Sequence, residues 1–182
     1  WEIAPPHMRR ISDALNETCV ASVLQDHEVV MVARASGSHF TAINMPMGTR
    51  LPAHATAMGR VLIAALPDEA RQDYLKSVTL KTLTEHTIID AADLASRIED
   101  ARVSGYAMVN EELELGLRTI AVPIHASDGT AIAGLAVSVY APRVSAEKLK
   151  KDALSLLQRA AEEISGLLPR PGSIDQRRPP LR

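Results

Sequence analysis

Residues 48–66 carry the features that an anion-binding helix N-terminus requires. A glycine and a proline precede a run of small side chains, in which Ala55, Ala57 and Gly59 belong to the expected first helical turn at 55–59. The first amides of a helix have no partner within it and carry a partial positive charge, so they can hold an anion. Small side chains there let a ligand approach the backbone. The alternative is an ordinary, closely packed helix whose glycine serves contact with a neighbouring element.

Other residue types that could do chemistry do not form a catalytic motif. The sequence contains no Gly-x-Ser-x-Gly elbow, no phosphate-binding loop and no His-Glu-x-x-His pair. The six histidines lack the spacing of metal ligands, and the single cysteine, Cys19, lies in an apolar stretch typical of a small buried side chain. The sequence therefore predicts no catalytic residue, no metal site and no cofactor.

Two groups of polar residues have more than one interpretation. Three glutamates within 111–114 could act as paired acid and base, or could be solvated or paired with Arg118 or another cation. Ser138 lies in an otherwise apolar run, where a buried hydroxyl needs a hydrogen-bond partner. That partner is either the backbone or a ligand in a pocket. Thr119 has the same two interpretations.

Hydrophobic periodicity indicates an α+β domain. Helices are predicted where apolar residues recur at three- and four-residue spacing, and strands where short apolar runs are bounded by turns. Adjacent strands joined by tight turns pair antiparallel, and the first and last helices should cover one face of the sheet. The predicted helices are 5–16, 55–66, 67–75, 90–104 and 145–168, and the predicted strands are 19–24, 29–33, 39–44, 106–110, 117–125 and 130–140.

Composition describes a globular domain with little affinity for nucleic acid of its own. The 182 residues are 46% hydrophobic, enough for a core, and the net charge of −2 provides no basic face for phosphates. Aromatic residues make up only 3%, which argues against a base-stacking platform. One cysteine suits a reducing compartment, and no apolar run reaches membrane-spanning length, so we expect a cytoplasmic protein without membrane contact.

The chain divides into one domain and a short tail. We expect residues 1–169 to form the domain. Residues 170–182 are rich in proline and arginine and cannot bury enough surface to offset the entropy of ordering, so we expect a disordered tail. The chain begins at Trp1 without an initiator methionine, which we interpret as the start of a fragment.

Several stretches, in order and with natural spacing over about residues 5–168, resemble the effector-binding domain of the IclR family of bacterial transcription regulators. The form Met-Gly-Arg-Val at 58–61 is similar to the branch that regulates aromatic-acid catabolism through the β-ketoadipate pathway. The matching stretches are LPAHATAMGRVLIA at 51–64, LTEHTIID at 83–90, GY at 105–106, EE at 111–112, GLRTIAVP at 116–123 and VS at 137–138, followed by Arg143.

The resemblance implies a GAF-like fold, a curved antiparallel sheet with helices packed on its faces. Members of this family carry an N-terminal winged helix-turn-helix, which is absent from this chain, so DNA contact would pass only through that missing domain. They act as homodimers or homotetramers. A small carboxylate bound in the effector domain changes operator or polymerase engagement. The implied role is that of a ligand sensor and not of an enzyme.

The resemblance also implies an effector pocket, position by position. Ala57 and Met58 match the helix-start positions whose amides meet the ligand carboxylate. Where some relatives have an aspartate this chain has Val109, which favours a less hydrophilic ligand such as an aromatic acid. The other matched positions are the apolar walls Phe40 and Ile43, then Leu117 and Thr119, and on the central strand Ala136 and Ser138.

Two other functions stay open on the sequence alone. A small-molecule enzyme such as a hydrolase, built on a similar pocket, would have only Cys19, the histidines and the glutamates to serve it. A purely structural oligomerisation module would have its interior filled by side chains. A helix-turn-helix in the parent gene would favour regulation over both.

Overall fold

The computed structural model describes residues 3–37 and 45–168. Within them, helices and strands alternate in the mixed order that the sequence predicts. In chain order the elements are α1 (Ala4–Leu15), β1 (Thr18–Gln25), β2 (Glu28–Ala35), β3 (Arg50–Pro52), a 3₁₀ turn (Ala53–Ala55), α2 (Ala57–Ala64), α3 (Asp68–Ser77), α4 (Ala91–Ser104), β4 (Ala107–Asn110), β5 (Leu117–His125), β6 (Ala131–Tyr140) and α5 (Ala146–Leu167).

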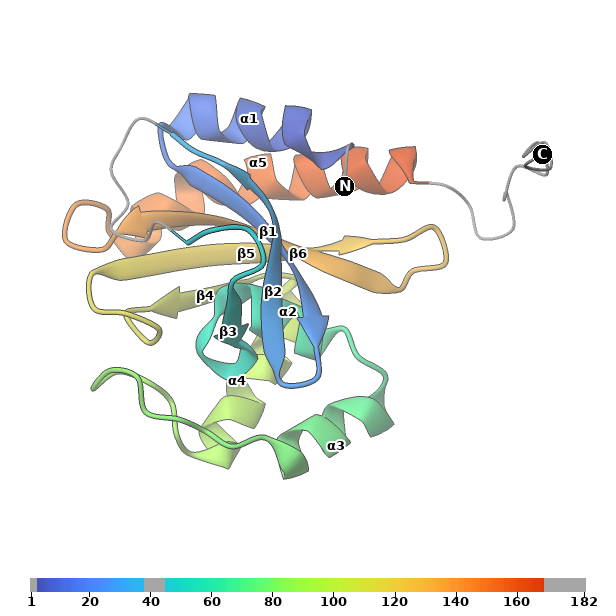
Figure 1. Cartoon of the computed structure of the whole chain (residues 1–182), viewed down its shortest axis with the longest axis vertical. Coiled ribbons are helices and arrows are strands. Elements are labelled where there is room, and N and C mark those ends of the chain that lie inside the picture. The colour runs from blue at the N-terminus through green and yellow to red at the C-terminus, as the bar shows by residue number, and fades with distance from the viewer. Residues whose placement is uncertain (1–2, 38–44, 169–182) are drawn as a thin grey trace, which may run out of the picture.

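One twisted antiparallel sheet divides the domain into two helical layers. The strand order is β3-β2-β1-β6-β5-β4, so the first and last hairpins meet at the centre through β1 and β6. Helices α1 and α5 lie together on one face, and α2, α3 and α4 lie on the other (Figure 1). This confirms the predicted α+β class with a curved antiparallel sheet and helices packed on its faces.

The larger of two apolar cores lies between the sheet and helices α1 and α5. Ile120, Val122 and Ile124 alternate along β5 and are fully or almost fully buried there, as the period of two predicts. The long helix α5 begins at the N-cap Ser145, whose side chain accepts a bond from the Lys148 amide. The prediction that the first and last helices share one face is therefore confirmed.

Helix α2 packs closely on the opposite face because the strands present small side chains to it. Ala136 pairs with Ala121 and with Val20 across three neighbouring strands, and all three belong to the core around α2. Farther along β6, a Cβ atom added to Gly134 would lie 3.0 Å from the Cβ atom of Met58. Every residue of α2 is buried, so the helix is fixed between the sheet and α4.

The structure changes two local predictions and leaves two others outside the described residues. The helix predicted from Ala55 begins at Ala57, since Ala53–Ala55 form a 3₁₀ turn and the N-cap before α2 is extended. The predicted loop before it ends in β3, whose three residues pair with the start of β2. The predicted strand at 39–44 and the tail at 170–182 lie outside the described residues.

The lengths and compositions of the helices show whether any of them could span a membrane. In the described part of the chain, no helix combines the length and the apolarity that crossing a bilayer requires.

Candidate functional site

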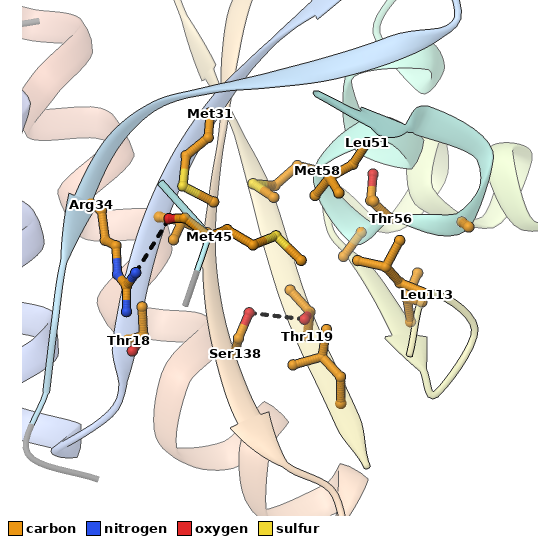
Figure 2. Close-up of a pocket in the computed structure, with 15 residues that line it drawn as sticks. Thr18, Met31, Arg34, Met45, Leu51, Thr56, Met58, Leu113, Thr119 and Ser138 are labelled. Atoms are coloured by element: carbon orange, nitrogen blue, oxygen red, sulfur yellow. Dashed lines mark hydrogen bonds between the residues drawn. The ribbon is translucent and has the colours of Figure 1, made fainter. Parts of the chain in front are cut away.

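A cavity lies between the N-terminus of α2 and the sheet. The space between its walls is about 590 Å³ when the open solvent at its mouth is counted. Residues of β1, β2, β5 and β6 form its floor, and the segments before α2 and after β4 form its sides (Figure 2). The described lining residues are Thr18, Val20, Met31, Arg34, Met45, Leu51, Ala55, Thr56, Ala57, Met58, Val109, Leu113, Leu117, Thr119 and Ser138.

Three hydroxyl-bearing residues lie in one row across the floor. Thr18 of β1 pairs in register with Ser138 of β6, and Ser138 pairs with Thr119 of β5. The Oγ1 atom of Thr119 and the Oγ atom of Ser138 are 2.9 Å apart, so one hydroxyl donates to the other (Figure 2). The hydroxyl that accepts this bond keeps its own proton and can donate it to a bound polar group.

The N-terminus of α2 lies at the wall of this cavity. Thr56 is the N-cap: its side chain accepts a bond from the Gly59 amide at 3.0 Å, and its carbonyl accepts one from Arg60. Helix geometry leaves the earlier amides, those of Ala57 and Met58, without a partner inside the helix. Both residues line the cavity, where their amides and the helix dipole favour an anionic group.

The side walls are apolar and partly adaptable. Met31, Met45 and Leu51 contribute from the β2–β3 side, and Leu113 with Leu117 from the β4–β5 side. Methionine side chains have three rotatable bonds and can repack around ligands of different shape. A ligand held here therefore needs an apolar body between polar ends.

Arg34 reaches the cavity because β2 contains a bulge. Ala33 pairs with Ala21, but the next pair along β1 is Ser22 with Met31, so Val32 is an extra residue in β2. A bulge of this kind brings residues three apart onto one face, whereas an uninterrupted strand would place them on opposite faces. The guanidinium of Arg34 donates from Nη1 to the Met45 carbonyl at 3.3 Å (Figure 2).

A buried ion pair supports the wall beside the cavity. Arg60 of α2 donates from Nη1 and Nη2 to both carboxylate oxygens of Glu112, at 2.8 and 2.5 Å, and donates from Nε to the His54 carbonyl. Thr87 donates its hydroxyl to the Glu112 carbonyl. This network fixes the segment that carries Leu113 into the cavity wall. One of the three glutamates thus pairs with a cation, as one interpretation of the sequence required.

The predicted partner Arg118 is engaged elsewhere. It donates to the Asn110 side chain at 2.6 Å and to the carbonyls of Ala141 and Val144. The cation that neutralises Glu112 comes instead from a helix 52 positions away in the sequence. The spacing of the residues gave no signal for that pair, because both members meet only through the tertiary fold.

Cys19 and His54 do not belong to the described lining of the cavity. Cys19 is fully buried on the α1–α5 face, and that burial raises the pKa of its thiol, which stays protonated. Burial also lowers the pKa of His54, so the neutral ring can donate from Nε2 to the Lys81 carbonyl. Among the described residues, no three His, Cys, Asp or Glu side chains gather as metal ligands.

The structure brings most of the implied pocket residues together. Ala57, Met58, Leu117, Thr119 and Ser138 all line the cavity. Ala136 lies one pair farther along β6, beneath α2, and belongs to the core rather than to the lining. Phe40 and Ile43 lie outside the described residues.

Sequence reasoning missed several lining residues. Thr18 and Arg34 gave no pattern-level signal, because the first depends on strand register and the second on the bulge. Leu113 follows the glutamate pair directly, and that position could have indicated it. Met31 and Met45 look like ordinary core residues in the sequence.

Comparisons with known proteins agree with this architecture. The family model described as bacterial transcriptional regulator IclR C-terminal matches residues 1–166. The Pca regulon regulatory protein of Pseudomonas putida is 36% identical over 162 residues, which are 88% of this chain and 56% of that protein. The p-hydroxybenzoate hydroxylase transcriptional activator of Acinetobacter baylyi is 34% identical over 179 residues, and the match covers 91% of this chain and 66% of that protein. The chain thus spans between about half and two thirds of these relatives.

Solved structures show the same fold. A transcriptional regulator from Rhodococcus sp. RHA1 matches with a TM-score of 0.87 and 38% identity, covering 91% of this chain and 66% of that one. The inducer-binding domain of PobR from Acinetobacter, a double mutant in complex with 3-hydroxybenzoic acid, matches with a TM-score of 0.85 and 33% identity. That match covers 92% of this chain and 98% of the PobR domain.

Proposed function

The chain belongs to the IclR family of bacterial transcriptional regulators, and we propose that its cavity binds a small organic carboxylate, aromatic or keto, as the regulatory effector. Its relatives are transcription regulators and not enzymes. The observation that carries the proposal is the joint presence, in one apolar cavity, of helix-start amides and a hydroxyl pair.

The proposed binding mode uses both ends of the cavity. The ligand carboxylate accepts bonds from the amides of Ala57 and Met58, where the helix dipole adds to the attraction. A second polar group bonds to the hydroxyl pair of Thr119 and Ser138. The apolar walls enclose the ring or chain between these contacts.

Regulation requires that the ligand bind two arrangements of the parent protein with different affinity. We propose that residues 1–169 are the sensing domain and that DNA contact passes through a winged helix-turn-helix outside this chain. The names of two relatives, HTH-type regulators KdgR, support such a domain in the parent. We further propose that the protein assembles as a homodimer or homotetramer and acts in the cytoplasm. Residues 170–182 would be a tail that takes no part in sensing.

The alternative functions have less support. The described residues that line the cavity include neither a histidine nor a carboxylate, so a hydrolase would lack its base there. Cys19 lies in the other core. A structural module would have filled this interior with side chains, whereas an open cavity remains between α2 and the sheet.

Calorimetry on the folded domain tests the proposal. We would titrate benzoate, 4-hydroxybenzoate, 3,4-dihydroxybenzoate, pyruvate and 2-oxoglutarate, and we expect saturable one-site binding by at least one of them. A folded domain that binds none of these acids would contradict the proposal.

A pocket-filling variant locates the binding site. Leu117→Trp adds a large ring where Leu117 lines the cavity, and we expect it to weaken binding at least tenfold. Leu115→Trp is the matched control, since Leu115 is 58% exposed two residues away and does not line the cavity. Equal loss in both variants, or no loss in Leu117→Trp, would place the ligand elsewhere.

A further inference from the structure

Three of the six methionines in the chain line the cavity beside α2. Met31 and Met58 are 5% and 4% exposed, whereas Met45 is half-buried. In Figure 2 the side chain of Met45 extends from the β2 side into the cavity. The wall that a ligand would contact therefore includes three thioether groups, and Met45 carries the one most accessible to solvent.

Backbone hydrogen bonds hold the segment that presents Met45 to the cavity. The Gly48 amide donates to the Met31 carbonyl at 2.9 Å, and the Met31 amide donates to the Thr49 carbonyl at 3.0 Å. The turn after Met45 is thus attached to β2. Met45 lies in the cavity wall, whereas Met47, two residues farther on, is 58% exposed and does not belong to the described lining.

Among the described lining residues, methionine is the residue type that a peroxide oxidises. The sulfur lone pair forms a bond to one peroxide oxygen as the O–O bond breaks, and the departing hydroxide takes the proton of the transferred oxygen and leaves as water. The sulfur is oxidised by two electrons and hydrogen peroxide is reduced. The product, methionine sulfoxide, is polar, and methionine sulfoxide reductases return it to the thioether.

The residue type that would compete most strongly for the oxidant is inaccessible. Cysteine reacts as the thiolate, but Cys19 is fully buried in the other core, and that burial raises the pKa of its thiol. Met8 is fully buried in the same core. A thioether has no proton to lose, so its reactivity does not depend on ionisation. Peroxide therefore reaches Met47, Met45 and the half-buried Met108 first.

We propose that Met45 is a site of reversible oxidation that regulates the cavity: its sulfoxide weakens effector binding, and bound effector shields the sulfur from peroxide. This inference rests on the proposed effector site and adds a means of regulation to it. A sulfoxide oxygen in this wall would lose its water when a ligand covers it, and the carbon skeleton of the ligand offers no donor in return. The ligand in turn occupies the space through which peroxide reaches Met45.

Peptide mass spectrometry of the wild-type domain measures the rate of oxidation at each methionine. The domain is treated with hydrogen peroxide, alone and with a saturating concentration of the acid that binds most tightly in calorimetry. We expect the acid to slow oxidation of Met45 by about tenfold or more, because only the unliganded fraction reacts. Met108 is the matched control, since it is also half-buried but packs against the α1–α5 core. Its rate, and that of Met47, should not change.

Calorimetry then connects the modification to binding. Met47→Leu removes the exposed sulfur outside the cavity and provides the background protein. We expect peroxide to lower its effector affinity about tenfold, and methionine sulfoxide reductases with a dithiol to restore it. Adding Met45→Leu, which keeps an apolar side chain of similar volume, should abolish this response. Its affinities before and after peroxide should agree, whatever their starting value.

A polar substitution tests the same idea without an oxidant. Met45→Gln places an uncharged polar group in the cavity wall, and we expect it to weaken effector binding severalfold. Met47→Gln makes the same change two residues away at an exposed position and should leave the affinity unchanged. Circular dichroism of each protein, before and after peroxide, reports whether the fold is intact.

The outcomes separate the oxidation site from the effector site. If an acid binds but protects Met45 no more than Met108, or if the sulfoxide form binds as tightly as the thioether, the inference is wrong and the effector site stands. If Met45→Leu still loses affinity on oxidation, the assignment to Met45 is wrong. If the folded domain binds no acid, the proposed function fails and this inference fails with it. Protection in the wild-type domain decides the question even if a variant does not fold.

Discussion

At the scale of single residues, the cavity floor depends on two hydroxyls that satisfy each other. Thr119 is 7% exposed, and its Oγ1 atom bonds to Ser138 across the strand pair β5–β6. A buried hydroxyl without a partner costs more than a bond between two hydroxyls gains. The pair therefore keeps polar atoms in an apolar cavity at low cost, and it holds them ready for a ligand.

Removing one hydroxyl at a time should reveal this mutual dependence. We expect Thr119→Val and Ser138→Ala each to lower the free energy of unfolding by about 1 kcal/mol, since each leaves the other hydroxyl without its side-chain partner. The double variant should cost less than the sum of the two. Urea unfolding of the four proteins measures the coupling. Strict additivity would show that the two hydroxyls act independently.

At the scale of elements, helix α2 determines where the cavity begins. Its sequence is almost wholly apolar or small, and it lies buried between the sheet and α4. Close contact at its first turn comes from Gly59, because a Cβ atom there would lie 2.1 Å from the Ala53 carbonyl oxygen. The glycine therefore allows the 3₁₀ turn to pack tightly against the first turn of α2, which carries Ala57 and Met58.

Two Gly→Ala substitutions in different helices test this close approach. We expect Gly59→Ala to destabilise the domain by about 1–3 kcal/mol, because the new methyl group overlaps backbone atoms that must shift. It should also weaken effector binding. Gly166→Ala in α5 has no atom within 4 Å of the new methyl, so the better helix propensity should stabilise it by up to about 1 kcal/mol. Thermal and urea unfolding would measure the stability of both variants. Equal changes in stability would refute the packing argument.

At the scale of the whole molecule, the Arg60–Glu112 pair joins α2 to the segment between β4 and β5. The side chains are only 2% and 8% exposed. The Ile88 amide also donates to the Glu112 carboxylate, so the segment before α4 belongs to the same network. Three parts of the chain that are distant in sequence are thus held together beside the cavity.

Breaking this pair on one side should be costly. Glu112→Gln leaves the buried guanidinium of Arg60 without its counter-charge, and we expect a loss of about 3–5 kcal/mol in unfolding free energy. The combined variant Arg60→Met with Glu112→Leu removes both charges and should recover much of that loss. Chemical denaturation measures each.

An exposed ion pair provides the control for this prediction. Glu28→Gln breaks the contact between Glu28 and Arg50, whose side chains are 45% and 46% exposed, and should cost no more than about 1 kcal/mol. A similar loss in Glu28→Gln and Glu112→Gln would mean that burial of the second pair has no energetic consequence.

The sequence by itself determined most of the described elements and the face that α1 and α5 share. Local signals sufficed for these: Asp90 and Gly105 cap α4, close to the ends of the predicted helix 90–104, and alternation along β5 places Ile120, Val122 and Ile124 on one face of the strand. The hydroxyl of Ser138 in an otherwise apolar run also indicated the need for a hydrogen-bond partner. These features depend on neighbours within a few positions, so a linear pattern records them.

Only the tertiary structure decided how the cavity is completed. Strand register placed Thr18 beside Ser138, and the long-range fold brought Glu112 to Arg60. The extra residue Val32 turned Arg34 into the cavity, on the side of the sheet that Met31 occupies. Alternation alone would have directed Arg34 to the other side. The physical reason is that face and partner depend on the pairing of distant strands, and one unpaired residue reverses the side on which all later residues lie.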